Sequence, residues 1–187
     1  VMMSVGFGPN QFAYTPGRGA RDVLALTMLL WVQALAADLH VAVYCSDVSG
    51  AFDRVDTQRL LAKLRAQKIN SKLISVIKAW LQQRTSNVLV GGACSRQMLL
   101  KHMLFQGTVL GPTLWNLFFE DARLALNEWM FSEVIYADDL NAFRIFGNAV
   151  GVDAMQKSMD NCQQELHAWG AANQVLFDGA KESKHIL

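Results

Sequence analysis

The sequence predicts an α+β fold in which helices cover one face of an antiparallel sheet. Short apolar runs rich in β-branched and aromatic residues, typical of strands, alternate with longer segments whose apolar residues recur at helical spacing. Two of these runs, residues 132–137 and 140–146, lie close enough in sequence to form a hairpin with a tight turn. With 187 residues and 52% hydrophobic content, the chain is large and apolar enough to bury one sizeable core.

A helix and a strand are the first expected elements. Residues 20–38 have apolar side chains on every side, which predicts a buried helix. The apolar run within it contains Thr27 and Gln33 and is shorter than a membrane span requires, so no membrane association is expected. Residues 41–47 form an apolar run that predicts a strand.

Two helices and a hairpin are expected next. Asp56 is expected to cap a helix that ends near Gln67, and Ser71 to cap a second helix, because short polar side chains accept hydrogen bonds from the first backbone N–H groups of a helix. Residues 87–104, interrupted by Gly91-Gly92, predict a hairpin. The apolar face of the second helix is expected to consist of Ile74, Ile77 and Leu81.

The second half of the chain is expected to alternate helices and strands. A helix should run from Pro112, which suits a first helical turn, to about Trp129. The two strands introduced above then place Asp138-Asp139 in the tight turn between them. The remaining elements are expected to be a helix at residues 149–171 and short strands at 174–178 and 184–187.

Composition restricts the function classes. The formal net charge of +1 is small for a nucleic-acid-binding protein, and most lysine and arginine clusters are expected to be solvated helix faces. The cysteines, Cys45, Cys94 and Cys162, are scattered and have no spacing that predicts a zinc site, so free thiols in a reducing compartment are expected. Nothing at the amino terminus resembles a signal peptide.

The pair Asp138-Asp139 is the most informative feature. It follows an apolar strand, and adjacent carboxylates there are unfavourable unless something neutralises them. Mg²⁺ is the usual partner, since it prefers oxygen ligands and retains several waters. The alternative is a solvated turn, because aspartate pairs are also common turn residues.

A second apolar run, residues 41–47, also ends in a carboxylate, Asp47. If the two strands lie side by side, Asp47 converges with Asp138 and Asp139. Three carboxylates around two cations about 3.5–4 Å apart is the arrangement used for phosphoryl transfer. The alternative is that Asp47 is a helix-capping or turn residue, since Ser49-Gly50 follows.

A third segment lies between these two. Gly107 allows another backbone or a ligand to approach closely, and Pro112 begins an apolar helix. By itself, this segment is equally well explained as an ordinary loop that leads into a helix.

The order of the three segments resembles the palm of reverse transcriptases, where they look like motifs A, B and C. The closest resemblance is to the enzymes of LINE-like, non-LTR retrotransposons. Residues 11–22 look like the fingers segment of that group, although Ala13 and Tyr14 stand where its pattern usually has Gly and Phe, and residues 169–182 look like motif D. The matching motifs are Asp47-x4-Phe52-Asp53, Gln106-Gly107-x3-Gly111-Pro112-x3-Asn116 and Tyr136-Ala137-Asp138-Asp139.

The resemblance implies an RNA-directed DNA polymerase that adds deoxynucleotides to a primer 3′-hydroxyl by two-metal nucleotidyl transfer. It implies that Asp47 and Asp138 hold two Mg²⁺ or Mn²⁺ ions and that Asp139 is a more peripheral carboxylate. The backbone carbonyl of Val48 would be a further ligand.

The resemblance also implies roles in binding substrates. Phe52 would lie beneath the incoming sugar and exclude a 2′-hydroxyl by a clash, while Gln106 and Gly107 would line the nucleotide pocket. Lys181 would protonate the leaving pyrophosphate, and Arg18 would hold template phosphates. The structural alternatives are a core aromatic for Phe52, a solvated lysine for Lys181 and a helix-capping residue for Arg18.

The resemblance implies a partial fingers segment at residues 1–40 and a palm at residues 41–187. The upstream fingers, thumb and endonuclease regions are expected to belong to a longer polyprotein. The expected partners are an RNA template, a DNA or RNA primer and dNTPs, inside the cell in the cytoplasm or nucleus. Two alternatives stay open: an RNA-dependent RNA polymerase, and a catalytically inactive fragment that binds nucleic acid or a partner.

Overall fold

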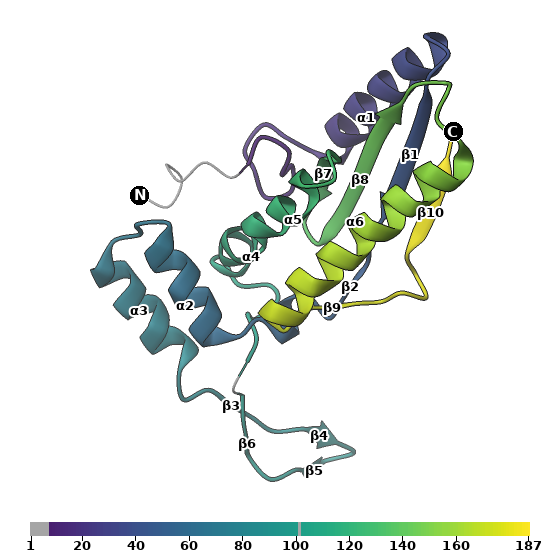
Figure 1. Ribbon diagram of the computed structural model, residues 1–187. Helices are drawn as coiled ribbons and strands as arrows, with labels where there is room; N and C mark the ends of the chain where they lie inside the picture. The colour runs from purple at the N-terminus through teal and green to yellow at the C-terminus, as the bar shows by residue number, and fades with distance from the viewer. Residues whose placement is uncertain (1–7, 101) are drawn as a thin grey trace.

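The computed structural model describes residues 8–100 and 102–187 (Figure 1). Its central feature is a four-stranded sheet in the order β10-β1-β8-β7, in which every neighbouring pair is antiparallel. The antiparallel sheet predicted from the sequence is confirmed. The strands are β1 (His40–Cys45), β7 (Ser132–Tyr136), β8 (Asp139–Phe146) and β10 (Ser183–Ile186).

Helices cover both faces of this sheet, so the expectation of helices on one face was wrong. The helices α1 (Ala20–Ala36) and α6 (Val152–Asn173) lie on opposite sides of β1 and β8 (Figure 1). Residues alternate between the faces of a strand, and both sets are apolar in β1. Val41 and Val43 belong to the small cluster beneath α1, whereas Ala42 and Tyr44 belong to the main core beneath α6.

The helix α1 is not buried, which corrects a second expectation. Its inward stripe contains the buried Thr27 and Ala34. Its other side leaves Leu24, Leu29 and Val32 61%, 56% and 58% exposed. The reason is that the sheet covers only one side of the helix, whereas the sequence is apolar all round.

The helices α2 (Thr57–Ala66) and α3 (Ser71–Leu81) form as expected. Asp56 caps α2 by accepting a hydrogen bond from the Arg59 N–H at 2.8 Å. The cap of α3 is Asn70, which accepts from the Lys72 N–H at 2.9 Å, so the assignment of Ser71 was one residue late. The apolar face of α3 is buried as predicted, at Ile74, Ile77 and Leu81.

The helix that begins near Pro112 is broken into pieces instead of running to Trp129. The helix α4 (Gly111–Phe119) passes into a 3₁₀ turn (Glu120–Arg123) and then into α5 (Leu124–Asn127). The α4 segment is buried on nearly all sides. It packs against α2 in the main core.

Short strand pairs complete the described part of the chain. The predicted hairpin forms around Gly91-Gly92 but ends at Leu99, before residue 104, and both glycines have positive φ. The helix α6 and the two short C-terminal strands form close to their expected ranges. The short strands are β2 (Val48–Ser49) paired with β9 (Leu176–Phe177), β3 (Thr85–Ser86) with β6 (Met98–Leu99), and β4 (Leu89–Val90) with β5 (Ala93–Cys94).

None of the helices formed by residues 8–100 and 102–187 has the length and apolar character that crossing a membrane requires.

Candidate active site

The β7–β8 hairpin presents Asp138 at its tip. Tyr136 pairs with Asp139, so Ala137 and Asp138 form the turn and Asp139 is the first residue of β8. The sequence predicted this hairpin but placed Asp138-Asp139 in the turn, one residue too late. Ala137 has a φ of 60°, in the left-handed region that non-glycine residues seldom adopt. A tertiary contact is therefore needed to explain the turn.

Two buried side chains provide that contact. The Gln11 amide donates to the Ala137 carbonyl and accepts from the Ala137 N–H, both at 3.3 Å. The Trp115 indole N–H donates to the same carbonyl at 3.0 Å. Gln11 is 4% exposed and Trp115 is fully buried. Sequence analysis assigned no role to either residue, since no local pattern connects them with a turn so distant in the chain.

Asp47 follows the end of β1 and is held mainly through the backbone. The preceding residue, Ser46, donates from its N–H and its hydroxyl to the Leu140 carbonyl, at 3.0 and 2.9 Å. The Asp178 N–H donates to the Asp47 carbonyl at 2.9 Å. These contacts place Asp47 beside the start of β8, as predicted from the two apolar runs.

The three carboxylates interact electrostatically. Partial burial raises the pKa of Asp138, and the charges of Asp139 and Asp47 add to this effect. Burial and the charge of Asp47 likewise raise the pKa of Asp139. Asp138 and Asp139 therefore hold their protons more tightly than a free aspartate does.

The side chains of Asp47, Asp138 and Asp139 fit a hard divalent cation, because such a cation prefers oxygen ligands and would offset the repulsion between the carboxylates. In residues 8–100 and 102–187, however, no three Asp, Glu, His or Cys side chains form a ready-made cluster that could hold a metal ion. Lys181 partly neutralises the site, because its Nζ lies 3.2 Å from Asp47 Oδ2 and 3.6 Å from Asp178 Oδ2. The hydrogen bond to Asp47 is the main cause of a raised pKa of Lys181.

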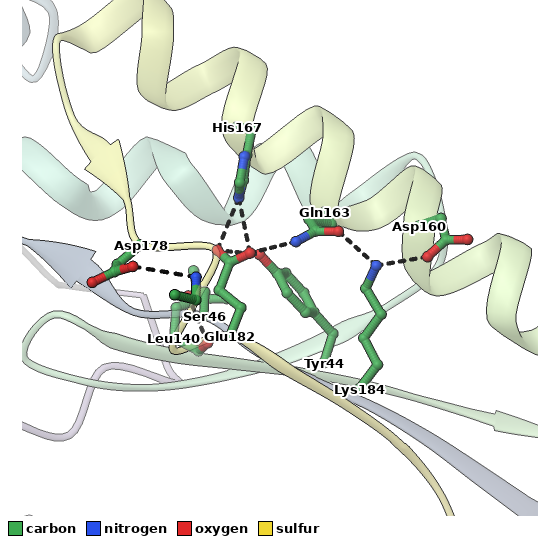
Figure 2. A network of polar contacts seen from close by, with 10 residues as sticks. Tyr44, Ser46, Leu140, Asp160, Gln163, His167, Asp178, Glu182 and Lys184 are labelled. Carbon is green, nitrogen blue, oxygen red and sulfur yellow. Dashed lines mark hydrogen bonds and ion pairs between the residues drawn. The ribbon is translucent and has the colours of Figure 1, made fainter.

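A buried polar network anchors the segment that carries Lys181 (Figure 2). Glu182 follows Lys181 directly, and its side chain is 2% exposed. It accepts from the Tyr44 hydroxyl at 2.8 Å, contacts His167 Nε2 at 2.8 Å and accepts from the Gln163 amide. Because Tyr44 lies on β1 and the other two partners lie on α6, this network fixes the C-terminal segment to the strand that leads to Asp47. No pattern in the sequence predicted this network.

A cavity of about 570 Å³ lies beside the Asp138 turn. It brings together residues that the sequence singled out in separate motifs. Trp115 stacks on the Phe52 ring at a centroid distance of 5.6 Å, so Phe52 both packs on the core and faces the cavity. Tyr14 also lines the cavity, although sequence analysis noted it only as a departure from the fingers pattern. The predicted site residues in the lining are Val48, Phe52, Gln106, Gly107 and Asp138.

Arg18 lies apart from this group. Its guanidinium donates to the Pro9 carbonyl and, at 3.4 Å, to the Gln11 carbonyl. It also lies over the Phe12 ring, 5.2 Å from the ring centroid. In this structure Arg18 therefore tightens the loop that carries Gln11, and its contact with a template stays a prediction.

Comparison with known proteins gives consistent matches. Residues 2–174 match the family described as reverse transcriptase (RNA-dependent DNA polymerase). The RNA-directed DNA polymerase from the mobile element jockey of Drosophila funebris is 27% identical over 168 residues, which are 87% of this chain and 18% of that protein. The Pol polyprotein from the type-1 retrotransposable element R2 of Popillia japonica is 27% identical over 82 residues, or 44% of this chain and 14% of that protein.

Solved structures show the same fold. Apo telomerase from Candida tropicalis superposes with a TM-score of 0.69 at 11% identity, covering 94% of this chain and 33% of that one. Telomerase from Candida albicans gives a TM-score of 0.67 at 10% identity, covering 89% and 30%. The family match over residues 2–174 agrees with the order of the three motifs and with the hairpin that presents Asp138. The relatives from jockey and R2 confirm the resemblance to LINE-like enzymes. The chain belongs to the reverse transcriptase (RNA-dependent DNA polymerase) family.

Proposed function

We propose that this chain is the palm, with part of the fingers, of an RNA-directed DNA polymerase that extends a primer on an RNA template with dNTPs. The observation that carries the proposal is the cavity in which Phe52, Gln106 and Gly107 adjoin Asp138. Residues 1–40 would be the fingers part, of which the first seven lie outside the described residues, and residues 41–187 the palm. The chain spans 18% of the length of its jockey relative, so the activity of the whole protein is part of the proposal.

Asp47, Asp138 and Asp139, with the Val48 carbonyl, would hold two Mg²⁺ or Mn²⁺ ions. Bound there, such ions supply charge neutralisation and activation of a hydroxyl nucleophile. The primer 3′-oxygen forms a bond to the α-phosphorus of the dNTP while the bond to pyrophosphate breaks, and the hydroxyl proton passes to solvent. Asp47 and Asp138 would hold both ions, and Asp139 would be the more peripheral carboxylate. In this scheme the carboxylates are ionised, so the raised pKa of Asp138 and Asp139 falls once cations are present.

Lys181 is the proposed source of the proton for the leaving pyrophosphate. Its ammonium already lies 3.2 Å from Asp47, at the edge of the site, and is free to move because its side chain is 63% exposed. The adjacent Glu182 is fixed in the core, which limits how far the lysine can swing.

Phe52 is the proposed sugar selector. Trp115 stacks on its ring, and Gly111 lies beside the ring, where an added Cβ would be in ordinary contact with it at 3.5 Å. A ring supported in this way cannot retreat from a 2′-hydroxyl, which favours dNTPs over ribonucleotides. We expect the enzyme to act inside the cell, in the cytoplasm or the nucleus.

A second candidate function is binding of nucleic acid without catalysis. It is favoured by the ion pair of Asp47 with Lys181, whose Nζ lies 3.2 Å from Asp47 Oδ2.

Primer extension separates the two functions. The chain is compared with its Asp138→Asn variant on poly(rA)·oligo(dT) with Mg²⁺ or Mn²⁺. Extension by the unsubstituted chain alone is the expected result. Equal extension by both would overturn the metal role of Asp138, and binding of the template–primer without extension under either metal would favour the second function.

A further inference from the structure

The turn that carries Asp138 is held by a side chain from near the start of the chain, Gln11. We propose that Gln11 is a positioning residue for the metal site, whose amide fixes the backbone from which Asp138 projects. This inference rests on the proposed metal site and deepens it, because it names a residue that controls the site without contacting a ligand.

The main contacts of the Gln11 amide are with one residue of the turn, Ala137. The Gln11 side chain bonds both polar groups of Ala137, its N–H and its carbonyl, each at 3.3 Å. Its oxygen also accepts from the Ala13 N–H at 3.0 Å. The amide therefore uses both its donor and its acceptor, and its orientation is determined by the partners it meets.

Backbone pairing places Gln11 where it can do this. The Phe12 N–H donates to the Ile135 carbonyl at 3.0 Å, and the Ile135 N–H donates to the Asn10 carbonyl at 2.9 Å. The segment thus lies alongside β7 and pairs with it through a short parallel bridge between Gln11 and Ile135. The Gln11 side chain then reaches the turn two residues further along.

A second clamp comes from α4. The Trp115 indole donates to the Ala137 carbonyl at 3.0 Å, and the amide of the neighbouring Asn116 donates to the Ala13 carbonyl at 3.0 Å. The loop that carries Gln11, the helix α4 and the turn therefore form one closed set of buried hydrogen bonds. The three hydrogen bonds that Gln11 and Trp115 make to Ala137 would be lost if the turn moved, and this loss disfavours other positions of Asp138.

The conformation of Ala137 explains why a clamp is needed. With a φ of 60° and a Cβ, this residue does not favour the turn by itself. Because Asp138 follows directly, a change in the Ala137 backbone would swing its carboxylate away from Asp47. Removing the Gln11 amide should therefore weaken metal binding more than it weakens the fold.

Mn²⁺ alone is the probe, and its affinity for the full chain is measured by electron paramagnetic resonance. The variants are Gln11→Met, Asp138→Asn as the control without a site, and Gln67→Met as the matched control. Gln67 is suited to this because its amide also donates to a backbone carbonyl, that of Leu117 at 3.0 Å, and makes no hydrogen bond to the turn. We expect Gln11→Met to raise the Mn²⁺ dissociation constant about tenfold, and Gln67→Met to leave it within about twofold.

The outcomes separate this inference from the proposed function. Failure of the unsubstituted chain to bind Mn²⁺ in an Asp138-dependent manner would overturn the metal site, and with it the role of Gln11. Unchanged affinity in Gln11→Met, or an equal loss in Gln67→Met, would overturn the role of Gln11 alone.

If Gln11→Met does not fold, amide hydrogen exchange of the unsubstituted chain gives the answer. The Ala137 N–H should exchange much more slowly than the Gly92 N–H, which lies in an exposed turn of the same length. Equal exchange rates at the two amides would show that the clamp does not hold the turn.

Discussion

The β4–β5 and β7–β8 hairpins both turn through two residues, yet they are stabilised by different means. In the first, Val90 pairs with Ala93 and the turn is Gly91-Gly92, with φ values of 57° and 82°. In the second, Tyr136 pairs with Asp139 and the turn is Ala137-Asp138. Glycine allows the first turn to form from local sequence alone. The second turn lacks glycine and is held by Gln11 and Trp115 instead.

The surroundings of the two hairpins differ accordingly. The strands of β4–β5 are exposed on both sides, with Leu89 and Val90 each 71% exposed. The β7–β8 hairpin belongs to the four-stranded sheet, and Ala137 in its turn is 9% exposed. This difference indicates that the chain specifies the peripheral turn by its residue type, and the turn that presents Asp138 by tertiary contacts.

Removing Trp115 should have the largest effect on this comparison. Trp115→Ala deletes a fully buried ring that stacks on Phe52 and Phe119, together with the indole bond to Ala137. We expect a loss of about 3–5 kcal/mol in the free energy of unfolding, measured by urea denaturation. The half-buried Trp80 is the control, and Trp80→Ala should cost clearly less. Equal losses of stability in the two variants would show that the Trp115 ring contributes no more to the fold than the Trp80 ring does.

A β-branched residue in the clamped turn should have the next largest effect. Ala137→Val places a branched side chain at a positive φ in a buried position, and we expect it to destabilise the protein by about 2 kcal/mol. Ala137→Gly is its matched control. Glycine relieves the local backbone strain but raises the conformational entropy of the unfolded chain. The free energy of unfolding should therefore change by no more than about 0.5 kcal/mol. Urea denaturation of both variants tests this, and similar stabilities of the two would contradict it.

The carboxylates of the clamped turn should give a smaller and pH-dependent effect. Burial and neighbouring charges raise the pKa of Asp138 above that of the unfolded chain. A raised pKa contributes stability that is present below the unfolded value and is lost as the pH rises through the folded one. At pH 7 without metal, ionised Asp138 is therefore destabilising.

Asp138→Asn should consequently raise the melting temperature of the metal-free chain at pH 7, and this gain should disappear near pH 3. Thermal unfolding at the two pH values measures the change. A lower melting temperature of the variant at pH 7 would show that the carboxylate is already compensated, for example by Lys181 through its contact with Asp47.

The exposed turn should show the smallest global effect. Gly91→Ala introduces a Cβ at a φ of 57° with open space around it, so strain arises from the backbone alone. We expect faster amide exchange in residues 89–94 and no measurable change in the urea midpoint of the whole chain, because this hairpin opens independently of the core. A shift of the global midpoint would show that the hairpin is coupled to the main sheet.

Much of the fold was predictable, and so was the proximity of several candidate site residues, because the signals were local. The strands before Asp47 and Asp138, the cap at Asp56 and the hairpin at Gly91-Gly92 each follow from residue type and spacing within a few positions. The order of the motifs indicated the family, which the comparisons confirmed. The approach of Asp47 to Asp138 and Asp139 followed from placing two strands side by side, and the antiparallel pairing of β1 with β8 provides that geometry.

The errors in the sheet coverage, in α1 and in the Asp138 turn arose where partners lie far apart in sequence. The coverage of both sheet faces and the exposed side of α1 depend on which surfaces meet, which hydrophobic periodicity does not specify. The buried Glu182 needs Tyr44, and the turn at Ala137 needs Gln11, across more than a hundred residues in each case.

By itself, then, the sequence determined most of the elements, the motif order and the family. Only the tertiary structure decided which residue stands in the turn, which face of α1 is buried and what anchors the segment of Lys181. The physical reason is that local propensity acts within a few residues, whereas the hydrogen bonds of Gln11, Trp115 and Glu182 exist only once distant segments have packed together.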